Sequence, residues 1–75
     1  MDKCESMVEI FKTNVDDHSQ AQQIVALLKH HFPAFFINFD LHDCDKILRV
    51  KGESIPIDDI VSLVSANGFE CSLLN

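Results

Sequence analysis

The chain has 75 residues, a formal net charge of -6, and a hydrophobic fraction of 47%. This length suits one domain with a modest core, and the apolar fraction is too high for a disordered chain. The acidic balance argues against nucleic acid and anionic membranes as partners, because both bind clustered Lys and Arg, and it favours a basic partner.

The first six residues are polar and charged, and we expect a mobile N-terminus (1–6) on a single domain (1–75). No apolar signal region follows a basic start, and no run reaches the ~20 apolar residues of a membrane span. We therefore expect a cytoplasmic protein. The chain has three widely spaced cysteines (Cys4, Cys44 and Cys71), which do not predict a secreted disulfide framework.

The first half of the chain predicts a strand followed by a helix. Met7–Thr13 is rich in strand-forming residues. Asp16 or Asp17 is a suitable N-cap for a helix over residues 18–31, and Pro33 ends that helix. The helix carries an apolar stripe at i, i+3, i+4 and i+7, formed by Ala21, Ile24, Val25, Leu28 and Phe32.

The middle of the chain predicts a β-hairpin. Residues 35–41 alternate, with Phe35, Ile37, Phe39 and Leu41 on one face. Residues 42–45 form a short polar connection, and residues 47–50 form the next strand.

The last third predicts a second helix and a final strand. Pro56 suits the first turn of a helix with the apolar stripe Ile57, Ile60, Val61 and Val64. Asn67-Gly68 ends the helix, and residues 69–74 form the last strand, in which Cys71 and Leu73 are expected to face the core.

The order βαββαβ predicts an α+β, ferredoxin-like sandwich, with a four-stranded antiparallel sheet and two helices on one face. In this topology the first and second strands run in the same direction. His18, His42 and Cys44 are therefore expected at the same end of the molecule.

Four stretches carry a resemblance to heavy-metal-associated (HMA) domains, the fold of small copper chaperones. Residues 8–15 resemble the first strand of that family and its metal loop, and the helix at 21–28 follows at the family's distance. Residues 37–50 resemble its central hairpin. Residues 64–69 resemble its closing Ala-x-Gly-Phe/Tyr turn. The resemblance implies the same fold over most of the chain.

The chain departs from the family at the metal site. The family binds metal through Cys-x-x-Cys, whose soft thiolates suit Cu(I) or Zn(II). Those two positions fall at Asp17 and Gln20, and the preceding Gly-Met positions hold Asn14 and Val15. No thiolate remains, so no metal-site residue is transferred from the family and no cofactor is expected.

A replacement metal site is the alternative interpretation. His18, His42 and Cys44, with nearby aspartates, are residue types that Zn(II) accepts, and the protein would then be a Zn or Cu chaperone or sensor. However, one strand is expected to separate the hairpin tip from the first helix by roughly 10 Å. The spacing also lacks a paired short-range motif, so we favour a metal-free protein.

Catalysis is not predicted. Ser19 beside His18 lacks a third partner, and two glycines in the whole chain leave no phosphate-binding loop. We therefore expect a non-catalytic protein-interaction or regulatory module that binds a protein partner or self-associates. Its expected surface is either the acidic end (Asp16, Asp17, Asp43 and Asp45) or the open sheet face, which Phe36 marks because it lies out of phase with the core residues.

Overall fold

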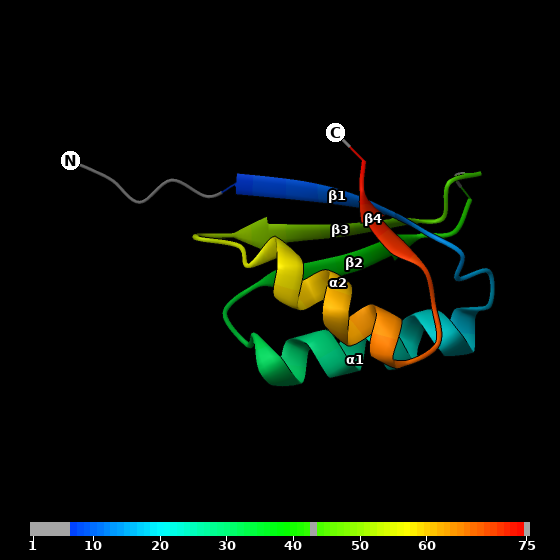
Figure 1. The fold of residues 1–75 in the computed structure, drawn as a ribbon, viewed down its shortest axis with the longest axis horizontal. Coiled ribbons are helices and arrows are strands. Elements are labelled where there is room, and N and C mark those ends of the chain that lie inside the picture. The colour runs from blue at the N-terminus through cyan, green and yellow to red at the C-terminus, as the bar shows by residue number, and fades with distance from the viewer. Residues whose placement is uncertain (1–6, 43, 75) are drawn as a thin grey trace.

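A computed structural model describes residues 7–42 and 44–74. Its elements are β1 (Met7–Thr13), α1 (His18–His31), β2 (Phe36–Asp40), β3 (Ile47–Gly52), α2 (Ile57–Ala66) and β4 (Cys71–Leu73). The strands form one antiparallel sheet in the order β2-β3-β1-β4, and both helices lie on the same side of it (Figure 1). The predicted ferredoxin-like α+β fold is confirmed.

The core lies between the sheet and the two helices. Phe11 at the centre of β1 stands opposite Leu48 of β3 and Leu73 of β4, and it is fully buried. Because side chains alternate along a strand, the register places one set of strand residues under the helices and leaves the other set on the far face. The helices contribute five buried residues to this core, namely Ala21, Ile24, Leu28, Ile60 and Val64.

Helix α1 begins and ends at the predicted residues. Asp17 is extended (φ -124°), and its Oδ1 accepts the backbone N–H of Ser19 at 3.1 Å, which satisfies a free donor of the first turn. At the other end, the N–H of Phe32 donates to the carbonyl of Leu28 at 2.7 Å, and Pro33 follows. Of the two predicted caps, Asp17 is therefore the one used.

Two predicted strands are shorter in the structure because neighbouring groups take their backbone amides. The N–H of Phe35 donates to the carbonyl of Phe32 at 3.0 Å, so Phe35 closes the turn after α1 and β2 starts at Phe36. The N–H of Glu70 donates to Asn14 Oδ1 at 2.8 Å, so β4 starts at Cys71. Strand β3, in contrast, continues to Gly52, two residues beyond its predicted end.

One further expectation in the last third was wrong. Pro56 precedes α2 and caps it, because its carbonyl accepts the N–H of Ile60 at 3.1 Å in the first helical hydrogen bond. Leu73 stands opposite Phe11 on the predicted side of the sheet, but it is 38% exposed because β4 is a short edge strand.

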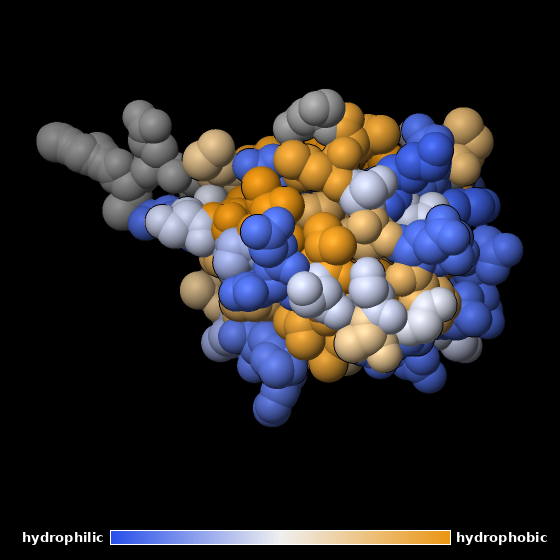
Figure 2. Space-filling view, viewed as in Figure 1, coloured by the Kyte–Doolittle hydropathy of each residue, from blue (hydrophilic) through white to orange (hydrophobic). Residues whose placement is uncertain are grey.

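Polar and apolar side chains are unevenly distributed on the face formed by α2 and β4. In this view apolar side chains gather over these elements, and hydrophilic ones gather toward both ends of α1 (Figure 2). None of the described helices is long and apolar enough to cross a membrane. The predicted mobile N-terminus at 1–6, with Cys4, and the hairpin residue Asp43 lie outside the described residues.

Candidate functional site

The sheet face opposite the helices is covered by no other helix or strand of the described residues. The strand register and the hydrogen bond from the N–H of Leu74 to the carbonyl of Ile10 place on this face Val8, Ile10, Lys12, Phe36, Asn38, Asp40, Ile47, Arg49, Lys51, Ser72 and Leu74, of which Ile47 is buried (5% exposed). Both helices pack on the other side (Figure 1). We call this set of residues the open face.

Large apolar side chains are exposed on the open face. Phe36 is 64% exposed, Val8 47% and Leu74 41%. Lys51 stands opposite both Val8 and Phe36, so these three side chains form one row across β1, β3 and β2. The predicted exposure of Phe36 is confirmed, and it is one member of a group rather than a scattered aromatic residue.

The open face also carries a cluster of positive charge. Lys12, Arg49 and Lys51 lie on it, and they are three of the six Lys and Arg residues of the whole chain. Asp40 is its single acidic residue within the described strands. The net charge of -6 therefore hides a local charge of opposite sign.

These cations differ in how free they are. Arg49 Nη1 donates to Asn38 Oδ1 at 3.4 Å, which orients the guanidinium over the middle of the face. Lys12 Nζ lies 3.9 Å from Asp45 Oδ1, an ion pair between partly exposed side chains. Such an exposed pair contributes little to stability, so Lys12 can exchange this carboxylate for another.

The predicted acidic end is partly engaged within the molecule. Asp17 caps α1, and Asp45 pairs with Lys12. Asp16 is exposed, and Asp43 lies outside the described residues. Asp17 thus already holds the start of α1, whereas Asp45 takes part in an exchangeable ion pair with Lys12 of the open face.

Asp17 and Gln20, the two positions that the resemblance to HMA domains predicted for metal ligands, lie at the start of α1. Asp17 accepts the N–H of Ser19, and Gln20 is half-buried in the first turn of α1. Just before them, Asn14 Oδ1 accepts the N–H of Glu70, and Val15 is fully buried. The side chains of the segment between β1 and α1 are therefore already engaged in hydrogen bonds and packing within the protein.

The residues of the alternative metal site are all exposed, and they divide between two places. His18 is on the first turn of α1, whereas His42 and Cys44 flank Asp43 in the β2–β3 connection. Among residues 7–42 and 44–74, no group of three His, Cys, Asp or Glu side chains could hold a metal ion.

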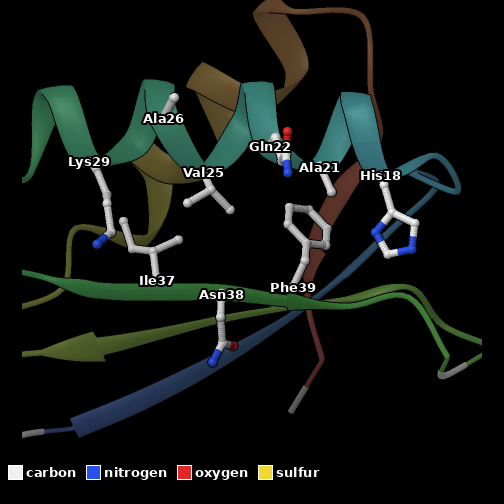
Figure 3. Close-up of a pocket in the computed structure, with 9 residues that line it drawn as sticks. All are labelled: His18, Ala21, Gln22, Val25, Ala26, Lys29, Ile37, Asn38 and Phe39. Carbon is white, nitrogen blue, oxygen red and sulfur yellow. The ribbon is translucent and has the colours of Figure 1, made fainter.

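A groove of about 480 Å³ runs between α1 and β2. Ala21 and Val25 of α1 face Ile37 and Phe39 of β2 across it, while Asn38 points to the open face (Figure 3). Gln22 and Ala26 complete the helix side. Lys29 and His18 stand at its two ends. The walls are thus apolar and both ends are polar.

The two described thiols differ in exposure. Cys44 is exposed in the hairpin connection. Cys71 is half-buried and packs against the core, and this burial raises its pKa from the ordinary value of 9.0 to about 11. A buried thiol with a raised pKa is a poor nucleophile at neutral pH.

No family model, curated protein or solved structure matches the chain. The site is therefore argued from the chain's own residues. Two of the cations of the open face could have been found from the sequence, because Arg49 and Lys51 have the two-residue spacing that places side chains on one strand face. The net charge of -6 gave no sign of them, because acidic residues outnumber basic ones in the whole chain.

Proposed function

We propose that the chain is a degenerate HMA-like domain that acts as a non-catalytic, cytoplasmic protein-interaction module, and that it docks an acidic partner protein on the open face. One observation carries the proposal: the uncovered side of the sheet combines exposed Phe36 and Val8 with Lys12, Arg49 and Lys51. Exposed apolar groups with charges of one sign favour a partner that presents apolar side chains among carboxylates.

A protein suits this surface better than a nucleic acid. Sheet surfaces that bind single-stranded RNA stack bases on aromatic side chains of their strands. On the open face, β1 and β3 contribute only aliphatic and basic side chains, and the single aromatic residue is Phe36 on the edge strand β2.

Site-specific photocrosslinking tests the docking surface. The photoreactive residue p-benzoylphenylalanine replaces Phe36 in one sample and Gln23, which is exposed on α1, in the other. Both proteins are irradiated in the cells that express them. We expect a covalent adduct with an acidic protein from position 36 and none from position 23. Equal adducts from both positions, or an RNA adduct at position 36, would overturn the proposal.

A charge-matched pair of variants tests the cations. Arg49→Gln/Lys51→Gln lowers the net charge by two on the open face, whereas Gln23→Glu/Ser62→Glu lowers it by two on the helix side. We expect the first pair to reduce the adduct at position 36 by at least tenfold, and the second pair to leave it unchanged. Equal losses from both would show that only the overall charge matters.

A further inference from the structure

The outer edge of β2 has no strand beside it. In the order β2-β3-β1-β4, β2 pairs only with β3, so every second residue of β2 directs its backbone N–H and C=O away from the sheet. No other backbone hydrogen bond engages β2 within residues 7–42 and 44–74. The edge is therefore a template for one more strand.

This edge lacks the usual protection against strand pairing. Natural edge strands are commonly blocked by Lys, Pro, a bulge or a covering segment. The sequence of β2 is Phe-Ile-Asn-Phe-Asp, and its single charged residue is Asp40 at the C-terminal end. The opposite edge strand, β4, has only three residues and offers a much shorter template.

The groove lies where the side chains of an added strand would go. Ile37 and Phe39 point into it and Asn38 points to the other face (Figure 3), so an added strand in register would likewise send alternate side chains into the groove. Ala21 and Ala26 are small, which leaves room between α1 and β2. Half-buried Val25 and Phe39 offer apolar contact.

The residues at the two ends of the groove favour a bound segment with an acidic group and with one chain direction. Lys29 stands toward Ile37, and His18 stands beside Phe39 (Figure 3). Within the described part of the chain, Lys29 has no carboxylate within ion-pairing distance. A strand added to β2 is more stable when it runs antiparallel to β2. A segment that runs in this direction has its C-terminal end near Lys29. Its acidic group then follows its apolar residues.

We infer that the outer edge of β2 and the groove beside it bind an extended segment of a partner protein, with alternate apolar side chains in the groove and a carboxylate facing Lys29. A second copy of the chain fits less well. The β2 strand of a second copy also follows alternate apolar residues with Asp40, but Asp40 lies on the open face and would point away from the groove and from Lys29. This site shares β2 with the open face, but it uses the backbone edge of that strand and the side that faces α1.

Selection from a random heptapeptide display library on the immobilised protein supplies the probe. We expect enrichment of peptides with apolar residues at alternate positions followed by Asp or Glu. In an NMR titration with the enriched peptide, amide hydrogen exchange along the outer edge of β2 should slow at least tenfold. Enrichment of no peptide, or binding that leaves the β2 amides unprotected, would overturn the inference.

Two variants on α1 separate groove filling from charge. Ala26→Arg places a long side chain at the groove, and Gln23→Arg adds the same charge elsewhere on the helix. We expect the first to weaken peptide binding at least tenfold and the second less than twofold. Because arginine would attract an acidic peptide, a loss caused by Ala26→Arg reports steric exclusion. Similar effects from both variants would contradict the groove as the site.

Lys29→Glu tests the charge, and sedimentation tests self-association. This variant should bind the enriched peptide about tenfold more weakly. It should bind more tightly to a version of that peptide in which Lys replaces the acidic residue. If the variant kept the preference of the parent for the acidic peptide, the inference that the partner segment is acidic would be overturned. If sedimentation showed a dimer that Ala26→Arg dissociates, the occupant of the groove would be a second copy of the chain and not a partner segment. Arg49→Gln/Lys51→Gln should leave peptide binding intact, so failure of the open-face proposal and failure of this one are distinguishable.

Discussion

The hydroxyl of Thr13 donates a hydrogen bond of 2.6 Å to the backbone carbonyl of Lys46, 33 residues further along the chain. The same oxygen accepts the N–H of Val15 at 3.2 Å, and the N–H of Thr13 donates to the carbonyl of Asp45 at 3.1 Å. Thr13 is 7% exposed. One buried side chain thus joins the end of β1 to the β2–β3 connection.

Thr13→Val should destabilise the protein by about 1–3 kcal/mol. Valine has nearly the same shape, but it leaves the buried N–H of Val15 and the carbonyl of Lys46 without this partner. The measurement is urea unfolding, with a lower midpoint and an unchanged m-value. Thr13→Ser is the control, because it keeps the hydroxyl. If serine destabilised as much as valine, the methyl group would be the important part and the hydrogen bonds would not.

Gly52→Ala should also destabilise the protein, because there is no space for the added methyl group. A Cβ at Gly52 would overlap Cδ1 of Phe35, whose ring stacks on Phe32 with centroids 5.4 Å apart. The ring must move, and overpacking of this kind costs about 1–3 kcal/mol. In a double-mutant cycle measured by urea unfolding, Phe35→Leu should recover part of the loss from Gly52→Ala. Purely additive effects would show that the ring is not the obstacle.

The cap of α1 gives a third test. Asp17→Ala removes the acceptor for the N–H of Ser19 and should cost about 1 kcal/mol, whereas Asp17→Ser should cost much less. Thermal unfolding followed by circular dichroism measures both. An equal loss in the serine variant would point to the charge of Asp17 rather than its hydrogen bond. Asp16→Ala, which removes an exposed neighbouring carboxylate, is the matched control.

The fold was predictable because its signals are local and repeat along the chain. The apolar stripe of α1, from Ala21 to Leu28, and the alternation around Ile37 each identify an element without knowledge of its neighbours. Capping chemistry then placed both ends of α1 correctly. The start of β4 was missed because a distant group decides it: Asn14 takes the amide of Glu70, 56 residues away, and no local pattern encodes that contact.

The candidate site was predictable only in part. The phase of Phe36 relative to Ile37 indicated its exposure. The gathering of Lys12 with Arg49 and Lys51 depends on the register of β1 against β3, which pairs Ile10 with Arg49 and Lys12 with Ile47. The groove depends on how α1 lies over β2 and on the small size of Ala21 and Ala26. Such relations arise from tertiary packing and are absent from single segments.

Alkylation should distinguish the two described thiols. Burial raises the pKa of Cys71 to about 11, so at pH 8 only about one Cys71 in a thousand is the reactive thiolate. In the folded protein its reaction with iodoacetamide, followed by peptide mass spectrometry, should keep accelerating with pH beyond 9 and toward 11. In urea the rate should level off near pH 9. Exposed Cys44 is the internal reference for reagent access.

The same shift has a consequence for stability. Because the folded state holds the thiol proton more tightly than the unfolded chain, this contribution is fully present below pH 9 and is lost as the pH rises through 11. Cys71→Ser, which has no proton to lose in this range, should therefore show a smaller loss of stability between pH 9 and pH 11 than the parent. If both proteins lost stability equally over that interval, the thiol of Cys71 would titrate alike in the folded and unfolded states.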